Sequence, residues 1–123
     1  MVVAVTVLTS FDEATLRSLG IERPLATHVE ALAMMAKAAG LDGVVASPLE
    51  ASAIRARCGG DFVIVTPGIR TGPSPPSDDQ ARTLSARQAL DAGANYLVVG
   101  RPILGAPDPA KAAQQIDAEL RGV

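Results

Sequence analysis

The stretch GVVASPLEASAIRARCGGDFVIVT, residues 43–66, contains two short β-branched runs with a helix-type segment between them. The runs GVVA (43–46) and FVIVT (62–66) are continuous instead of alternating with polar residues, which is typical of strands that are covered on both faces. Parallel neighbouring strands need a crossover of about this length, and the crossover is usually a helix. The stretch therefore predicts a β-α-β unit with a right-handed connection.

The same unit recurs on both sides of this stretch. Further β-branched runs occupy residues 2–8 (VVAVTVL) and 96–100 (YLVVG), and a helix-type segment follows each run. The expected helix starts are Thr27 to Glu30, Ser47 to Glu50, Ser85 to Gln88 and Asp108-Pro109, and the expected closing glycines are Gly20, Gly40 and Gly93. These signals predict an α/β fold with the element order βαβαβαβα.

Length and composition limit the class of protein. With 123 residues the chain is expected to form a single domain over residues 1–123, which is well short of the roughly 250 residues of a closed eight-stranded α/β barrel. The formal net charge of −2, with both signs scattered, argues against nucleic acid or an anionic membrane as a partner. Cys58 is the single cysteine, no metal-site spacing is present, and MVVAVTVLTS lacks the basic region of a signal peptide. We therefore expect a cytoplasmic protein without a metal.

Polar residues follow the predicted strands where ligands collect in parallel α/β proteins, at the carboxyl ends. Thr9, Ser47, Arg70, Gly100 and Arg101 occupy these positions, and neither a carboxylate pair nor a Ser-His-Asp set is among them. Glycine allows an oxygen to approach the backbone, and a guanidinium group binds phosphate with two parallel hydrogen bonds. Taken singly, an arginine after a strand is interpreted as a solvated surface charge and a glycine there as part of a turn. Together, at neighbouring strand ends, they predict a phosphate site.

Other chemically capable residues have simpler explanations. His28 and Cys58 lie in helix patterns and are expected to serve packing or the surface, while Asp42 precedes a strand and is not expected to be catalytic. Residues 66–82 (TPGIRTGPSPPSDDQAR) are too rich in glycine and proline for a helix or strand. This segment is interpreted either as a surface loop without a function or as a functional loop after a strand.

Five segments carry a family resemblance: AVTVLTS, GLDGVVAS, VTPGIR, DQAR and AGANYLVVGRPI followed by Asp-Pro. Through them the chain resembles the bacterial-type orotidine 5'-phosphate decarboxylases over essentially its whole length. Their order and spacing are similar to the fifth to eighth βα units of that family. The resemblance implies a parallel β-sheet with alternating helices, the (β/α)4 half of a TIM (β/α)8 barrel that corresponds to strands 5–8.

The resemblance also implies substrate-binding residues. In the family's pattern, the hydroxyl that contacts the pyrimidine or its neighbourhood falls on Thr9, and the phosphate-binding positions fall on Arg70, Gln80, Gly100 and Arg101. The family's Gly-Asp-Gln is replaced here by Asp78-Asp79-Gln80, in a loop that is richer in proline.

The catalytic Lys and Asp array of the family, which lies at the ends of earlier strands, has no counterpart in this sequence. Lys37 and Lys111 both lie inside helix patterns and cannot replace it. No catalytic residue is therefore expected in this chain, which is similar to the carboxy-terminal half of the barrel.

Several hypotheses for the function follow. The family converts orotidine 5'-phosphate to UMP and CO2 in pyrimidine biosynthesis without metal or organic cofactor, so the chain is expected to be the phosphate-binding half of such a decarboxylase and inactive alone. Alternatives are a stand-alone phosphate-binding module, a structural half-barrel and a related phosphosugar decarboxylase. A half-barrel has two open strand edges and one uncovered sheet face. The expected partners are orotidine 5'-phosphate or UMP and either a second copy of the chain or an amino-terminal half-barrel.

Overall fold

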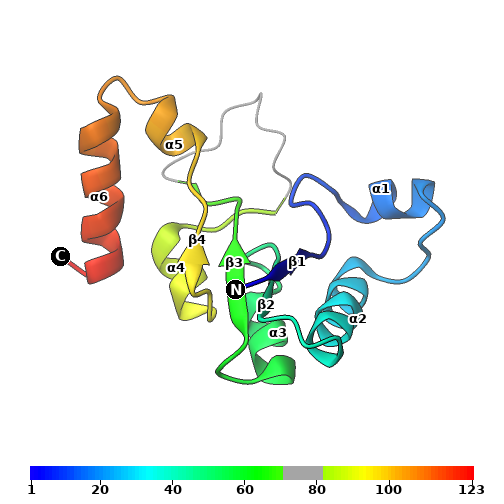
Figure 1. Cartoon of the computed structure of the whole chain (residues 1–123). Coiled ribbons are helices and arrows are strands. Elements are labelled where there is room, and N and C mark those ends of the chain that lie inside the picture. The colour runs from blue at the N-terminus through cyan, green and yellow to red at the C-terminus, as the bar shows by residue number, and fades with distance from the viewer. Residues whose placement is uncertain (71–81) are drawn as a thin grey trace.

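A parallel β-sheet forms the centre of the computed structural model, which describes residues 1–70 and 82–123 (Figure 1). Its strands are β1 (Val3–Val5), β2 (Gly43–Val45), β3 (Val63–Thr66) and β4 (Tyr96–Leu97), paired in the order β1-β2-β3-β4. Each strand lies inside the run that predicted it and is shorter than that run. Because the pairing follows the chain order, each strand adds to the same growing edge of the sheet.

Helices separate the strands. They are α1 (Glu13–Ser18) and α2 (Leu25–Ala38) before β2, α3 (Ala51–Cys58) before β3, α4 (Ala86–Asp91) before β4, and α5 (Arg101–Leu104) and α6 (Pro109–Arg121) after β4. The predicted alternation of strands and helices is confirmed. The short helix α5 is an addition that the sequence pattern did not predict; for α1 only the closing glycine, Gly20, was predicted.

Two of the predicted helix starts are confirmed. The Ser85 hydroxyl accepts from the backbone N–H of Gln88 (3.2 Å) while the Gln88 side chain accepts from the Ser85 N–H (3.0 Å), which is a complete capping box at α4. Asp108 caps α6 by accepting from the Lys111 N–H (3.0 Å). The closing glycines are confirmed as well: Gly20, Gly40 and Gly93 follow α1, α2 and α4 with φ angles of 83°, 81° and 108°.

The predicted N-cap at Thr27 is wrong, because the N-cap of α2 is Pro24 and the helix begins at Leu25. Pro24 takes the N-cap position with a φ of −53°, close to the helical value, but it offers no side-chain hydrogen bond. The Glu13 carboxylate of α1 supplies that bond by accepting from the Leu25 N–H (2.9 Å). A contact between two helices thus sets this boundary.

The predicted capping box from Ser47 to Glu50 is wrong for a similar reason. Helix α3 begins at Ala51, and the Ser47 hydroxyl closes a local turn by accepting from the Leu49 N–H (3.2 Å). The Glu50 carboxylate does not return to Ser47, since it forms a buried ion pair with Arg82.

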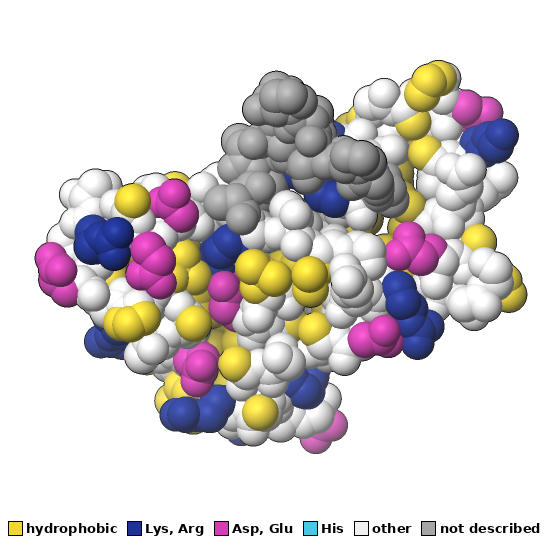
Figure 2. Space-filling model, turned by 180° about the vertical axis from the view of Figure 1, so that it is seen from behind, with side chains coloured by type: hydrophobic (Ala, Val, Ile, Leu, Met, Phe, Trp, Pro, Cys, Tyr) yellow, Lys and Arg dark blue, Asp and Glu magenta, His cyan; other side chains and the backbone are white. Residues whose placement is uncertain are grey.

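The two faces of the sheet differ in burial. Residues Val44 and Ile64, neighbours in the register of β2 and β3, are fully buried beneath the helices. On the other face Val5 and Tyr96, at the two edges of the sheet, are 61% and 56% exposed. Figure 1 is viewed onto this uncovered face, and Figure 2 shows the helical face behind it, where acidic and basic side chains are interspersed. One apolar sheet face is thus left open.

The apolar core is divided into two clusters. The first packs α1, α2 and α3 against β2 and β3, and the second packs α4 and α6 near β4. Buried members of the first are Val7, Leu16, Leu25, Val29, Ala33, Ala36, Val44, Ala46, Ala51, Ile54, Cys58, Phe62 and Ile64; those of the second are Ile69, Ala86, Ala89, Ala94 and Ile116. Aliphatic side chains dominate both, as the scarcity of aromatic residues requires.

Arg55 connects the turns at the amino edge of the sheet. Its guanidinium group donates to the carbonyls of Gly59 (2.7 Å) and Phe62 (2.5 Å) before β3, and to the carbonyl of Gly93 (2.8 Å) and the side-chain oxygen of Asn95 (2.6 Å) before β4. We expect Arg55→Ala to lower the free energy of unfolding by about 2–4 kcal/mol, because several charge-assisted hydrogen bonds are lost together. Chemical denaturation followed by circular dichroism measures this difference.

Arg57→Ala is the matched control on the same helix. Arg57 is exposed and forms one ion pair with Glu30 at 3.7 Å, so its replacement is expected to cost no more than about 1 kcal/mol. Equal effects of the two substitutions would show that Arg55 does not tie these turns together.

Candidate functional site

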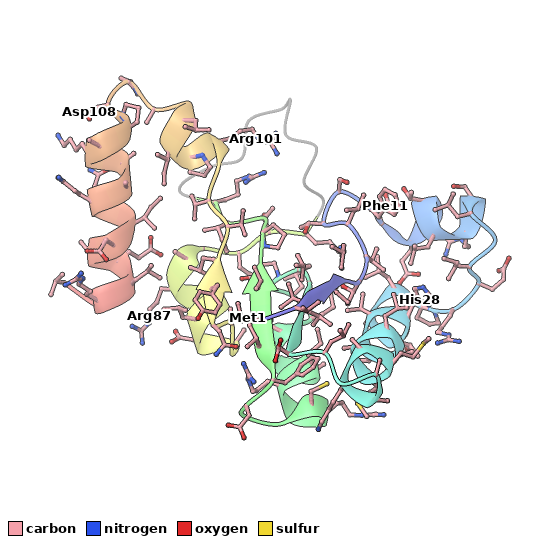
Figure 3. The ribbon with its side chains drawn as sticks, viewed as in Figure 1. Met1, Phe11, His28, Arg87, Arg101 and Asp108 are labelled. Atoms are coloured by element: carbon pink, nitrogen blue, oxygen red, sulfur yellow. The ribbon has the colours of Figure 1, made fainter. Side chains whose placement is uncertain are left out.

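The carboxyl ends of the four parallel strands lie together at one end of the sheet, at the top of Figure 1. This end is called the carboxyl edge; it is distinct from the outer strands β1 and β4. Thr9 follows β1, Arg70 follows β3, and Gly100 and Arg101 follow β4, so the topology places these four predicted site residues at this edge. Figure 3 shows Arg101 there, at the start of α5. The fifth residue, Gln80, lies outside the described residues.

Arg70 lies four residues beyond the end of β3 and is held there by hydrogen bonds. Its backbone N–H donates to the Leu84 carbonyl (3.0 Å), beside an isolated parallel bridge between Ile69 and Leu84. Its guanidinium group donates to the Ile69 carbonyl (2.9 Å), and the residue is partly exposed. The backbone at Arg70 is therefore fixed, and its cationic side chain stays close to the sheet edge.

Gly100 and Arg101 follow β4, which pairs with β3. The Val98 N–H donates to the Thr66 carbonyl (2.9 Å) and thereby extends this pairing to the carboxyl edge. Gly100 is the N-cap of α5, and a Cβ atom placed on it would meet nothing within 4 Å. Open space beside a glycine backbone, next to an exposed arginine, is suited to an anion.

Thr9 lies on the far side of β2 from these arginines. It is 5% exposed, and its Oγ1 atom is buried without a hydrogen-bond partner among the described residues. The structure thus brings Arg70, Gly100 and Arg101 to neighbouring strands and leaves Thr9 at the other end of the sheet.

Arg82 is a buried residue at this edge that the sequence analysis did not predict. Its guanidinium group forms an ion pair with Glu50 and donates to the backbone carbonyls of Val7 (3.3 Å) and Leu8 (3.0 Å). In turn, the Ser47 hydroxyl donates to the Arg82 carbonyl (3.4 Å). These partners are 32 to 75 residues away in the chain, so no local pattern reveals them.

The opposite, amino edge of the sheet contains a hollow of about 590 Å³, lined in part by Lys37, Asp42, Cys58 and Asp61. Lys37 donates through Nζ to the Cys58 carbonyl (2.7 Å). Burial raises the pKa of the Cys58 thiol, which keeps it protonated and unreactive near neutral pH. This hollow therefore offers no activated nucleophile.

Metal-ligand clusters and membrane-spanning helices are both absent from the described residues. Over residues 1–70 and 82–123, no group of His, Cys, Asp and Glu side chains is placed to hold a metal ion. Within the same ranges no helix has the length and apolar character needed to cross a bilayer. The residues at the carboxyl edge are instead suited to holding an anion.

The sequence and the fold of the chain are similar to those of known proteins. A sequence model described as "Orotidine 5'-phosphate decarboxylase / HUMPS family" matches residues 1–116. Proteins named orotidine 5'-phosphate decarboxylase from Geotalea daltonii and Moorella thermoacetica are 54% and 53% identical over 119 and 124 residues, covering 97% and 100% of this chain and 49% of each relative. The crystal structure of orotidine 5'-phosphate decarboxylase from Lactobacillus acidophilus superposes with a TM-score of 0.75 at 39% identity, covering 96% of this chain and 48% of that one. The chain spans about half the length of the curated relatives that it matches.

Proposed function

The chain belongs to the orotidine 5'-phosphate decarboxylase / HUMPS family, and from this membership we propose that it is the phosphate-binding half of an enzyme that converts orotidine 5'-phosphate to UMP and CO2. Its four parallel strands with alternating helices are a (β/α)4 half of a TIM barrel. We assign this half, residues 1–123 as one domain, to strands 5–8 of the complete barrel.

One observation supports the proposal most: two arginines and an open glycine follow the neighbouring strands β3 and β4. Arg70 and Arg101 supply guanidinium groups for the substrate phosphate, and Gly100 lets a phosphate oxygen approach the backbone. We also assign Gln80, which lies outside the described residues, to the phosphate, and the Thr9 hydroxyl, which is buried in this structure, to the pyrimidine end of the substrate. The phosphate does not react, but its binding by these residues supplies free energy that helps to position the reacting end of the substrate.

The reacting end needs groups that this half does not provide. Loss of the carboxylate leaves a carbanion on the pyrimidine, which must take up a proton. Lys37 lies at the amino edge with its Nζ bound to the Cys58 carbonyl, and Lys111 is an exposed residue in the first turn of α6. We assign the proton donor to the other half of the barrel.

The uncovered sheet face provides the surface for that other half. Val5 and Tyr96 are exposed on it, and β1 and β4 each have one edge without a paired strand among the described residues. Covering this face and both edges completes a closed barrel. The proposed partner is an amino-terminal half-barrel, with a second copy of the chain as the alternative. The single free cysteine, Cys58, supports a reducing, cytoplasmic setting for the assembly.

Calorimetric titration with inorganic phosphate and UMP tests the phosphate site. Arg101→Ala is expected to weaken phosphate binding by about 10- to 150-fold, which corresponds to the 1.5–3 kcal/mol typical of a hydrogen bond to a charged group. Arg101→Lys should recover only part of the affinity, because an ammonium group cannot reproduce the two parallel bonds of guanidinium.

Lys111→Ala is the control, since it removes one exposed positive charge on α6 and should leave the affinity nearly unchanged. Equal affinities for all variants would reject the phosphate site. Ribose 5-phosphate, which lacks a pyrimidine, separates the alternatives: binding as tight as that of UMP would favour a phosphosugar decarboxylase or a general phosphate-binding module.

A further inference from the structure

A buried polar cluster joins the carboxyl ends of β1 and β2. Arg82 and Glu50, whose side chains are 8% and 6% exposed, form its ion pair. The same guanidinium group donates through Nη2 to the carbonyls of Val7 and Leu8, the two residues that directly precede Thr9. One side chain therefore connects the start of α3 to the segment after β1.

Unused hydrogen-bonding capacity is concentrated at the same place. Among the described residues, four buried side-chain polar atoms have no partner: Thr9 Oγ1, Glu50 Oε2 and Arg82 Nε at this place, and His28 Nδ1 on α2. Buried polar groups are nearly always hydrogen-bonded, so such atoms require an explanation in function, strain or bound water. Of these groups, only the Thr9 hydroxyl belongs to a predicted substrate-binding residue.

Stability alone is a weak explanation for the ion pair. Replacing a buried ion pair by apolar residues of similar size is often neutral or stabilising, because desolvation offsets the attraction between the charges. Arg82 also fixes the relative position of two segments. Its Nη1 atom donates to the Glu50 carboxylate, while its Nη2 atom donates to the carbonyls of Val7 and Leu8. A planar, rigid guanidinium group makes such a fixed connection, and a flexible lysine does not.

We propose that Arg82, held by Glu50, is a positioning residue that fixes the backbone before Thr9 so that the Thr9 hydroxyl can meet the pyrimidine end of the substrate. The proposal rests on the proposed function, because it requires Thr9 to face substrate. Arg82 itself does not touch the ligand; it acts through the carbonyls of Val7 and Leu8.

Two measurements on the 123-residue chain test this role. First, Arg82→Lys should accelerate amide hydrogen exchange at residues 7–10, because the bonds to the Val7 and Leu8 carbonyls are lost, while exchange in α4 and α6 stays unchanged. Second, Arg82→Lys should weaken UMP binding by about 3- to 10-fold, the effect of one lost hydrogen bond, and leave phosphate binding unchanged. Thr9→Val should give the same selective loss for UMP.

The double variant Thr9→Val with Arg82→Lys is the decisive one. If both residues act on one contact, its UMP affinity should equal that of Thr9→Val alone. Arg87→Lys is the matched control, since Arg87 is exposed on α4 and pairs with Asp91 at 3.0 Å; it should change neither affinity. If Arg82→Lys does not fold, Arg82→Met with Glu50→Leu removes both charges together and should show the same selective loss.

The outcomes separate the two claims. Faster exchange at residues 7–10 together with a selective, non-additive loss of UMP affinity supports the positioning role. Equal losses for UMP and phosphate, or additive losses in the double variant, overturn it while the proposed function stands. A parent chain that binds neither UMP nor phosphate overturns both.

Discussion

Gly43→Ala should leave the chain without a cooperative unfolding transition. Gly43 lies at the start of β2, opposite Val63 of β3 in the parallel register. A Cβ atom on Gly43 would lie 2.6 Å from the carbonyl carbon and Cβ of Val63 and still closer to its carbonyl oxygen. Real Cβ atoms essentially never come this close to a backbone, so one strand must shift.

Any shift of β2 lowers the free energy of unfolding substantially, because β2 pairs with β1 on one side and with β3 on the other. We expect a cost of more than about 4 kcal/mol, in the range of severe core substitutions. Small domains are stable by only about 5–15 kcal/mol, and this sheet has one uncovered face. Circular dichroism during heating should show a sloping signal without a midpoint.

Gly60→Ala provides the comparison within the same chain. An added Cβ at Gly60 meets nothing within 4 Å, so this variant should keep the parent's melting temperature within a few degrees. A sharp transition for Gly43→Ala near that of Gly60→Ala would contradict the close approach of β2 and β3.

The second large effect concerns catalysis. The 123-residue chain alone should release no CO2 from carboxyl-labelled orotidine 5'-phosphate above the uncatalysed rate, because neither Lys37 nor Lys111 is placed to protonate the carbanion. Mixing it with the amino-terminal half of the Geotalea daltonii relative should restore turnover, if that half supplies the missing proton donor and covers the open sheet face. We expect a gain of at least roughly 10³-fold over either half alone, a small part of the acceleration that enzymes reach.

Two controls make this result interpretable. Sedimentation should show that the halves associate, so that a lack of turnover cannot result from a lack of docking. Replacing the parent chain in the mixture by its Arg101→Ala variant should lower kcat/KM, because binding of the substrate phosphate is weakened while the other half is intact. Turnover by the chain alone, or an associated pair without activity, would contradict the assignment of the two halves.

Features that depend on residues close together in the sequence could be predicted, whereas features that depend on residues far apart in the sequence could not. The strands and their alternation with helices along the chain came from continuous apolar runs, and the starts of α4 and α6 came from caps that bind only three residues away, such as Ser85 with Gln88. The predicted starts of α2 and α3 were wrong because contacts between residues distant in the sequence decide them. Glu13 caps Leu25 from another helix, and Glu50 binds Arg82 instead of Ser47.

The residues of the candidate site likewise fall into those that the sequence predicts and those that depend on contacts distant in the sequence. Arg70, Gly100 and Arg101 were predicted to lie at one sheet edge because parallel strands must share a carboxyl edge, and the structure places them there. Arg82 was missed because its hydrogen-bond partners are distant in the chain. The burial of the Thr9 hydroxyl likewise depends on tertiary packing that no strand pattern contains.

The division of the core has a consequence for synthesis on the ribosome. The buried members of the first cluster lie between Val7 and Ile64, whereas those of the second lie between Ile69 and Ile116. The growing chain therefore exposes all the buried residues of one cluster before any of the other has been added. Three strands and the helices between them can condense while α4 and α6 are still being translated, and the nascent sheet then serves as the template on which the last strand docks.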